Sequence, residues 1–365
     1  MKILPLGTSS GQPTMERGVS ALAAFVGSAN KWILVDCGEG TVQTIMRAGP
    51  IPHAGEPSSG AQEGEDPGAW RLRLSDLDAI CITHAHPDHC LGLFGVLLGV
   101  EALGRSKPLR IVAPREARLM AEAVLMHSHS PISFQLEWTV PEDGLRVELA
   151  PGLSCLCVRM AHRAPSHGYL FESIKPQLTA KREKLAMHGF SSGPVQGAAI
   201  AALKRGQAVT APDGAIIEAH EAIEFATVSE SLFVGGDNIE PSRVAAAAAG
   251  ALAWVHEATY LHEDWERGGA GVKWGHSSAR MIGEAAALGA PGALILTHFS
   301  PRYGEGPKGV EKLATEAASF YAGPIHLAMD LVPLEFAPRV NAMPAPASAP
   351  ISGPAGSAMQ PGSKV

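Results

Sequence analysis

The sequence contains no apolar run long enough to form a membrane-spanning helix. Its longest weakly polar stretch, Val244 to Val255, is mostly alanine and falls well short of the roughly 20 residues that a helix needs to cross a bilayer. The first residues, MKILPLGTSSG, reach glycine and serine too early for the apolar core of a signal peptide. We therefore expect a cytoplasmic protein with no membrane partner.

Cysteine is scarce and never occurs in a CxxC pair. The chain has five cysteines: Cys37, Cys81, Cys90, Cys155 and Cys157. This odd and scattered set is typical of buried thiols in a reducing compartment, so we expect reduced cysteines rather than disulfides.

Positive charge is also in short supply, because 29 basic residues face 36 acidic ones and leave a net charge of −7. This balance argues against a protein whose whole surface binds nucleic acid. Between Ser173 and Gly206, however, Glu183 is the only acidic residue. The basic residues of this segment are Lys175, Lys181, Arg182, Lys184, Lys204 and Arg205. Any contact with RNA is expected to come from this local patch.

The order of the predicted elements indicates a layered α/β architecture. Three strands follow one another within residues 1–40 without a helix, which argues against a simple doubly wound sheet. Farther along, strands such as LDAICIT and ALILTHFS alternate with helical patterns such as RLMAEAVLMHS and PSRVAAAAAGA. Residues 50–70 are rich in Gly, Pro, Ser and acidic residues and predict a flexible surface insertion. Residues 338–365 are mostly Pro, Ala, Ser and Gly and predict a disordered tail.

The strongest chemical signal is the sequence THAHPDH at residues 83–89, directly after an apolar strand. Imidazole suits zinc, and a neighbouring carboxylate can hold a second ion. The spacing lets His84 and His86 point to one metal while Asp88 and His89 point to another. The alternative is a polar loop with incidental histidines, which would leave these side chains without a common purpose.

Three further candidate ligands stand at the ends of predicted strands. His162 closes LSCLCVRMA, Asp237 follows SLFVGG, and His298 ends ALILT. Each alone would more often be structural, but strand ends of one α/β layer can meet at a single site, and a carboxylate at Asp237 could bridge two metals. We therefore predict a two-zinc centre.

Two zinc ions about 3.5–4 Å apart can share a hydroxide whose pKa is drawn towards roughly 7, and can neutralise charge during attack on phosphorus or carbonyl carbon. Asp88 could accept the proton of the water. His276 in GHSSAR could donate a proton to the leaving oxygen, and Glu257 in HEATY could orient that histidine. On the residues alone, the last two roles stay open.

Three other motifs predict nothing catalytic. Residues 7–11, GTSSG, fit the G-x-S-x-G elbow around Ser9, but a Gln-Pro pair and then a strand follow instead of a helix. Residues 304–309 fit GxGxxG, yet they contain a proline and lack the strand–turn–helix context of a dinucleotide loop. The histidines of residues 127–129, HSH, follow a helix with no acidic partner and predict a solvated pair.

Taken together, these motifs resemble the ribonuclease Z (tRNase Z) family of the metallo-β-lactamase superfamily, the endonucleases that process tRNA 3′ ends. The matching segments within residues 1–337 are LGTSSGQPT, VDCGEGT, THAHPDH, AHRAPSHGY, GGD, HEATY, GHSSA and THFSPRY. HxHxDH marks the whole superfamily, whereas HEAT, the HS pair and SPRY are more specific to the family. The resemblance implies one α/β hydrolase domain over residues 1–337, a metallo-β-lactamase αββα sandwich with a protruding flexible arm.

The resemblance also implies roles for individual residues. One zinc takes His84, His86 and His162; the other takes Asp88, His89 and His298; Asp237 bridges them. Asp88 is the implied general base, and Glu257 with His276 forms the implied proton-donating relay. His162 is selected over His167 because the family's ligand lies six residues before the Gly-Tyr pair that is here Gly168-Tyr169. The chain departs from the family at Asn238 and at Ser277 or Ser278, where threonine is usual, without losing a ligand.

The family's flexible arm, which clamps tRNA, corresponds to residues 173–206. Its implied RNA-binding residues are Lys175, Lys181, Arg182, Lys184, Gly193, Pro194, Lys204 and Arg205. The alternative interpretation of residues 173–206 is an ordinary solvated helical hairpin that does not bind RNA. The implied protein is a cytoplasmic homodimer with two Zn²⁺ per subunit that binds precursor tRNA and cuts the phosphodiester 3′ of the discriminator nucleotide. Two rivals are a small-molecule phosphodiesterase or other ester hydrolase of the same fold, and a non-catalytic RNA-binding scaffold.

Overall fold

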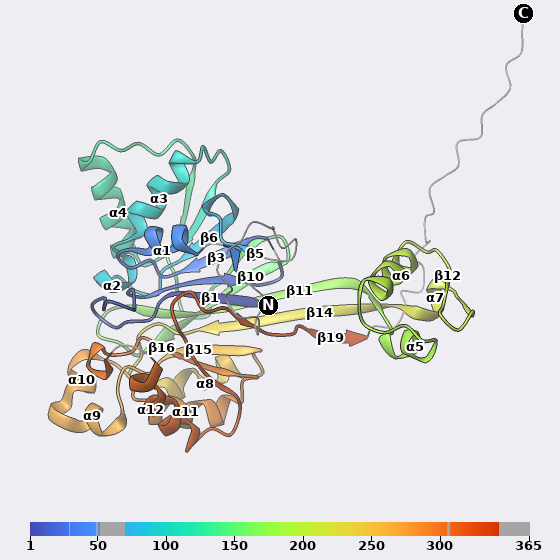
Figure 1. Ribbon diagram of the computed structural model, residues 1–365. Helices are drawn as coiled ribbons and strands as arrows, with labels where there is room; N and C mark the ends of the chain where they lie inside the picture. Colours follow the sequence, from blue (N-terminus) through green and yellow to red (C-terminus); the bar gives the residue numbers. More distant parts are fainter. Residues whose placement is uncertain (29, 49, 52–69, 305–306, 343–365) are drawn as a thin grey trace, which may run out of the picture. The chain divides into compact units, whose positions relative to one another are not determined.

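The computed structural model describes residues 1–28, 30–48, 50–51, 70–304 and 307–342. They form two compact units (Figure 1). The first comprises Met1–Ile174 and Ser229–Pro338, and the second comprises Lys175–Val228 with the segment that begins at Arg339. The predicted insertion is described only at its ends, where β4 (Pro50–Ile51) pairs antiparallel with β5 (Trp70–Arg71). Residues 52–69 and the predicted tail beyond residue 342 lie outside the described residues.

One sheet has seven strands in the order β18-β1-β2-β3-β6-β7-β8. The strands are β1 (Lys2–Gly7), β2 (Ala21–Phe25), β3 (Trp32–Val35), β6 (Leu77–Cys81), β7 (Leu109–Val112), β8 (Leu136–Thr139) and β18 (Leu334–Glu335). The pairs among β18, β1, β2 and β3 are antiparallel, and those among β3, β6, β7 and β8 are parallel. The connecting helices are α1 (Thr41–Arg47), η1 (Leu74–Asp76), α2 (Pro87–Cys90), α3 (Leu93–Ala102) and α4 (Arg115–His127).

The other main sheet has the order β17-β16-β15-β14-β11-β10-β9, with β19 also paired to β14. Its strands are β9 (Arg146–Ala150), β10 (Leu153–Met160), β11 (Ser166–Ala180), β14 (Ile223–Val234), β15 (Ala253–Glu257), β16 (Leu294–Thr297), β17 (Ile325–Leu327) and β19 (Arg339–Ala342). The helices that follow β14 in the first unit are η2 (Pro241–Val244), α8 (Ala245–Ala248), α9 (His262–Glu266), η3 (Arg267–Gly269), α10 (Ala270–Trp274), α11 (Ala279–Gly289), η4 (Pro301–Tyr303) and α12 (Pro307–Ala318).

Three stacked cores define the layers of the first unit. Alternate residues of β3 face different cores, Leu34 towards α1, α3 and α4, and Ile33 towards the second sheet. On the far side of the second sheet, Trp254 and Leu294 pack with α11 and α12. The layers therefore run helix, sheet, sheet, helix (Figure 1), which confirms the predicted αββα sandwich. None of the described helices combines the length and apolar character that crossing a bilayer requires.

The second unit has a small core of its own. It contains α5 (Arg182–Met187), α6 (Pro194–Lys204), α7 (Ala219–Ala222), β12 (Val209–Thr210) and β13 (Ile216–Ile217). Leu185, Phe190, Leu203 and Ile217 are buried against one another. Most of the predicted arm, residues 173–206, falls in this unit, which continues to Val228 because apolar residues after Gly206 complete its core.

Two elements differ from the sequence prediction. The segment predicted as one helix, PSRVAAAAAGA, is a 3₁₀ turn followed by a four-residue helix that ends at Ala248. Gly250 then adopts a left-handed φ of 68°, a conformation that favours glycine and ends the helix. Residues 339–342, predicted as the start of the tail, instead form β19 and pair with β14. Composition missed this strand because backbone hydrogen bonds to a neighbouring strand need no large apolar side chains.

Candidate metal centre

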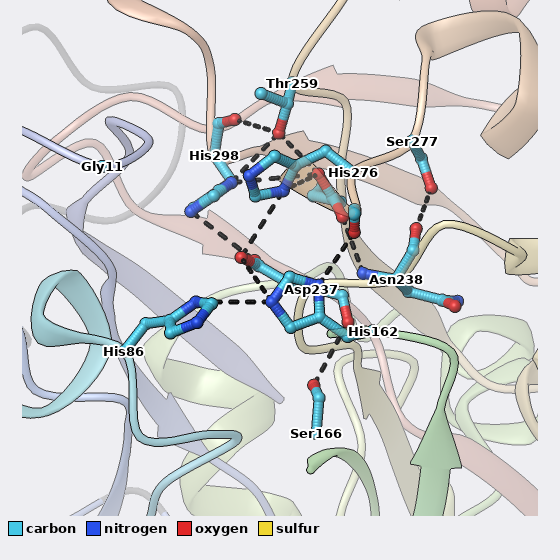
Figure 2. Close-up of polar contacts among 12 residues, drawn as sticks. Gly11, His86, His162, Ser166, Asp237, Asn238, Thr259, His276, Ser277 and His298 are labelled. Atoms are coloured by element: carbon cyan, nitrogen blue, oxygen red, sulfur yellow. Dashed lines mark hydrogen bonds and ion pairs between the residues drawn. The ribbon is translucent and has the colours of Figure 1, made fainter. Parts of the chain in front are cut away.

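The site forms where several strands end. His84 and His86 follow β6, and Pro87 begins α2, which carries Asp88 and His89. His162 follows β10, Asp237 follows β14, and His298 follows β16. The structure brings all of these predicted ligands into overlapping groups whose ligand atoms lie within 4.8 Å of one another. Figure 2 shows His86, His162, Asp237 and His298 converging from their separate segments.

The first group consists of His84, His86, His162 and Asp237. Nδ1 of His86 lies 3.0 Å from Nε2 of His84 and 3.3 Å from Nε2 of His162. Oδ2 of Asp237 lies 3.5 Å from Nε2 of His84. Three imidazole nitrogens and one carboxylate oxygen thus surround a common point.

The second group consists of Asp88, His89 and His298, and Asp237 also reaches it. Nε2 of His298 lies 3.1 Å from Nε2 of His89 and 3.3 Å from Oδ2 of Asp88. Oδ1 of Asp237 lies 3.4 Å from Nε2 of His89 and 3.5 Å from Nε2 of His298. The two oxygens of Asp237 therefore face the two groups separately, which is the arrangement expected of a bridging carboxylate.

The residues fit a bound cation. Ring nitrogens only 3.0–3.3 Å apart would repel one another if every ring were protonated, whereas neutral rings can all direct lone pairs at one ion. Burial, reinforced by the charge of His89, holds the pKa of His84 well below its usual value, which favours the ligating form. Burial opposes ionisation of Asp237, but the surrounding histidines outweigh it and lower the pKa of that carboxyl. Imidazole and carboxylate donors in this number support a divalent metal.

Sequence reasoning missed Asp36, which supports His89 from behind. Oδ2 of Asp36 lies 2.7 Å from Nδ1 of His89 and accepts a 2.9 Å hydrogen bond from the Thr83 hydroxyl. Oδ1 accepts the Thr83 backbone N–H at 2.7 Å. Asp36 has a φ of 57°, uncommon for a residue other than glycine, and its hydrogen bonds hold it there. An acid directly after the buried strand WILV was the signal available.

Replacing Asp36 with alanine is expected to weaken the binding of a divalent metal by about 10- to 100-fold, because His89 loses the carboxylate that fixes its ring and raises its basicity. Chelator competition on the folded protein measures this. Asp76→Ala is the matched control, since Asp76 only pairs with Lys31 at the surface and its loss should not alter metal affinity. Equal affinities in the two variants would contradict the supporting role of Asp36.

Thr259 and Gly275 support two other ligands. The Thr259 hydroxyl lies 2.5 Å from Oε2 of Glu257 and 3.0 Å from Nδ1 of His298. The carbonyl oxygen of Gly275 lies 2.8 Å from Nδ1 of His162 and can accept its proton. Both contacts favour rings protonated at Nδ1, with the Nε2 lone pairs free for the site. His298, like Asp36, has a positive φ, 58°.

The buried Glu257 and the partly buried His276 form an ion pair beside Asp237. Nδ1 of His276 lies 3.1 Å from Oε2 of Glu257 and 3.5 Å from Oδ2 of Asp237, and the contact with Glu257 is not aligned as a hydrogen bond. Burial alone would lower the pKa of His276, but Glu257 and Asp237 overcome it and raise the pKa to about 9. The imidazolium is therefore the favoured form at neutral pH, as a proton donor requires.

Asp88 is held as a carboxylate. Burial would raise its pKa, but His89 and His298 outweigh burial and lower the pKa well below its usual value. Its Oδ2 accepts a 2.8 Å hydrogen bond from the backbone N–H of Gly11. The carboxylate is thus oriented by both the N-terminal loop and the second ligand group.

Asn238, at a position where the resembled family usually has threonine, connects the segments that carry the site. Its Oδ1 accepts the backbone N–H of Ala161 at 3.1 Å, next to His162. Its own backbone N–H donates to Oε1 of Glu257 at 2.7 Å, and its carbonyl accepts the hydroxyl of Ser277 (Figure 2). The asparagine is therefore integrated into the site.

In the rejected GTSSG motif the backbone of Gly11 contacts Asp88, but the Ser9 hydroxyl does not take part in the site. Ser9 is buried and donates its hydroxyl to the carbonyl of Gln12 at 2.7 Å. His127 and His129 are exposed at the end of α4. His167 is buried outside the ligand groups, and its backbone N–H donates to the Thr83 carbonyl at 2.9 Å.

The basic residues of the predicted arm are only partly neutralised. A groove of about 930 Å³ in the second unit is bordered by Lys181, Arg182, Lys184 and Lys204. Lys184 pairs with Glu221 at 3.3 Å, and Lys181 lies 4.0 Å from Glu224. Arg205 contacts Gln207 at 3.3 Å instead of lining the groove. Gly193, with a φ of 140°, and Pro194 begin α6.

The fold and the ligands at its strand ends define a hydrolase of the metallo-β-lactamase superfamily, and the sequence model of that superfamily matches residues 17–149. Ribonuclease Z of Marinobacter nauticus is 33% identical over 333 residues, covering 90% of this chain and 94% of the relative. Ribonuclease Z of a Pseudomonas putida strain is 34% identical, with 91% and 95% covered. The chain belongs to the ribonuclease Z family.

Solved structures agree on the fold. The short form of human tRNase Z is 19% identical and superposes with a TM-score of 0.58, covering 92% of this chain and 99% of the human one. The metallo-β-lactamase fold protein YhfI from Bacillus subtilis is 14% identical, with a TM-score of 0.57 and coverages of 91% and 98%. At these identities the likeness concerns architecture alone.

Proposed function

We propose that this protein is an endoribonuclease that hydrolyses the phosphodiester bond 3′ of the discriminator nucleotide in tRNA precursors. The observation that carries the proposal is the Glu257–His276 ion pair beside Asp237, within the cluster of predicted ligands. A phosphodiesterase of this type needs a proton donor next to its metal ligands, and the family membership supplies the substrate class.

Two zinc ions per chain are part of the proposal. His84, His86 and His162 would hold one, Asp88, His89 and His298 the other, and Asp237 would bridge them. When bound, such a pair supplies a nucleophile from water at neutral pH and neutralises charge on the phosphate. The contacts of the two Asp237 oxygens with different ligand groups support this assignment.

Asp88 and His276 each carry out one of the two proton transfers in the proposed reaction. Asp88 is ionised and oriented by Gly11, and it accepts a proton from the attacking water while the water oxygen bonds to phosphorus. The bond from phosphorus to the 3′ oxygen of the discriminator then breaks, and His276 donates its proton to that oxygen. Glu257 stabilises the imidazolium before transfer. The products are a tRNA with a free 3′ hydroxyl and a trailer with a 5′ phosphate.

Incubation of an unprocessed tRNA transcript with the zinc-loaded protein tests this function. Mapping both new ends should find a 3′ hydroxyl on the discriminator and a 5′ phosphate on the trailer. Hydrolysis of bis(p-nitrophenyl) phosphate without any cleavage of the transcript would instead favour the small-molecule phosphodiesterase.

The second unit is the proposed tRNA-binding arm. Replacing residues 175–228 by a short Gly-Ser turn between β11 and β14 should lower kcat/KM for precursor tRNA by at least about a hundredfold, because several phosphate contacts are lost together. Hydrolysis of bis(p-nitrophenyl) phosphate reports whether the metal centre survives and should persist. Normal cleavage of precursor tRNA by the shortened protein would show that the basic groove has no role in binding.

A cytoplasmic homodimer is also part of the proposal, based on the family resemblance. Sedimentation equilibrium gives the mass in solution, and a species of one chain at all concentrations would exclude the dimer.

A further inference from the structure

Helix α10 ends at Trp274, two residues before His276, and leaves this indole at the surface. Trp274 is 49% exposed, although an indole of this size usually stays largely buried. Its neighbours Val272 and Lys273 are exposed as well. An aromatic face is therefore exposed on the segment that leads directly to the proposed proton donor.

The backbone that carries Trp274 is fixed to the metal centre. Gly275 has a left-handed φ of 81°, and its carbonyl oxygen lies 2.8 Å from Nδ1 of His162. A Cβ at Gly275 would come within 2.8 Å of the same ring, so glycine permits this close approach. The indole N–H of Trp265 donates to the carbonyl of His276 at 2.7 Å on the other side. The exposed indole thus has a fixed attachment next to the candidate catalytic residues.

Two cations accompany the indole. Nζ of Lys273 lies 5.0 Å, and the guanidinium carbon of Arg163 5.7 Å, from the Trp274 ring. Nη1 of Arg163 donates to the carbonyl of Lys273 at 2.9 Å, which holds the arginine in place. Within the described part of the chain, neither cation forms an ion pair with a carboxylate. Their charge is available to an anionic ligand.

We propose that Trp274, Arg163 and Lys273 form a nucleotide subsite of the metal centre, in which the indole stacks on an unpaired base flanking the scissile bond and the two cations contact its phosphates. An exposed aromatic ring with adjacent cations is a common surface for single-stranded nucleic acid, because every base has a face that can stack. Arg163 directly follows the candidate ligand His162, and Trp274 lies two residues before the proposed donor His276, so an RNA strand bound at the site as proposed can extend onto this surface. The subsite therefore rests on the proposed function.

Kinetics on precursor tRNA test the stacking. Trp274→Ala should raise KM by about 10- to 100-fold with a smaller change in kcat, and Trp274→Phe should restore most of the loss because it keeps an aromatic face. Val272→Ala is the matched control on the same helix, and neither its KM nor its hydrolysis of bis(p-nitrophenyl) phosphate should change. A Trp274→Phe variant as defective as Trp274→Ala would indicate a packing role and overturn the subsite.

Abasic substrates identify the stacked base. Precursors lacking the base on either side of the cleavage site are compared in the wild type and in Trp274→Ala. If the indole stacks on one of these bases, removing that base from the substrate raises the KM of the wild type. The same removal has little further effect on the KM of Trp274→Ala, which has already lost the stacking partner. The proposal would be refuted if removing either base raised KM by the same factor in the wild type and in Trp274→Ala.

Lys273→Met should reduce the salt dependence of RNA binding by about 0.7 in the slope of log affinity against log salt concentration, the value for one single-strand phosphate contact.

Direct binding separates this inference from the proposed function. The affinity of a fluorescein-labelled single-stranded oligoribonucleotide is measured by anisotropy for the wild type and Trp274→Ala, independently of cleavage. A wild-type protein that fails to cut precursor tRNA refutes the proposed function. Equal oligonucleotide affinities of the two proteins refute the subsite, whereas a weaker affinity of the variant supports it in either case.

Discussion

Alanine at His86 is expected to abolish cleavage of precursor tRNA, with a fall in kcat/KM of at least about a thousandfold, because several kcal/mol of metal-derived stabilisation would be lost. Nδ1 of His86 lies within 3.3 Å of both His84 and His162, so it belongs to the centre of the first ligand group. Its removal leaves two imidazoles and one shared carboxylate oxygen for that ion. Transcript cleavage and the zinc content per chain are measured on the same preparation.

RNA binding by the His86 variant should remain close to that of the wild type. The basic groove belongs to the second unit, whereas His86 belongs to the first. A gel-shift assay with precursor tRNA measures the affinity, and His129→Ala serves as the matched control because that histidine is exposed and outside the ligand groups. Wild-type turnover in the His86 variant would rule out the proposed metal-dependent mechanism.

The candidate ligands could be identified from the sequence because all of them directly follow predicted apolar strands. His84, His86, Asp88 and His89 form a dense motif directly after an apolar strand, and His162, Asp237 and His298 each end such a strand. In a layered α/β fold, successive strand ends can meet at one edge, so polar residues at these positions are natural candidates. The structure brings them together, and the first unit has the predicted layers.

The residues that support the candidate ligands could not be predicted from the sequence in the same way. Thr259 acts through a hydroxyl shared between Glu257 and His298, and Gly275 acts through a backbone carbonyl that any residue type could offer. The positive φ of Asp36 and His298 is uncommon for residues other than glycine, and although Asp and His adopt it more often than most types, the residue type alone does not mark these two positions in the sequence. Side-chain identity therefore identifies candidate ligands more readily than the groups that orient them.

The extent of the second unit depends on packing rather than on charge. The basic residues end near Gly206, and the predicted segment ended there too. The core of the second unit nevertheless needs Ile217 and Ala222, which lie beyond Gly206 in a stretch whose charged residues are acidic. A boundary drawn from charge alone marks where RNA contacts are expected, and the folded unit must be larger because a helix pair of this size cannot bury enough apolar surface by itself.

Alanine at His276 should lower kcat for precursor tRNA by about 100- to 10,000-fold, the usual contribution of a general acid, while zinc content stays unchanged. His276 lies 3.5 Å from Oδ2 of Asp237, close enough to serve the reaction but outside the two sets of proposed metal ligands. Loss of zinc from this variant would mean that the histidine is a ligand and that the relay has been misassigned.

Glu257 acts only through His276 in this mechanism, so the two substitutions should not be additive. Glu257→Gln alone should reduce kcat, because the imidazolium loses the carboxylate 3.1 Å away that raises its pKa. Added to His276→Ala, it should cause little further loss of kcat.

The pH profile gives independent evidence. A proton donor must be protonated, so wild-type kcat should decline as pH rises through the pKa of His276. That alkaline limb should be missing in His276→Ala. An unchanged alkaline limb in the variant would assign the proton donor to another group.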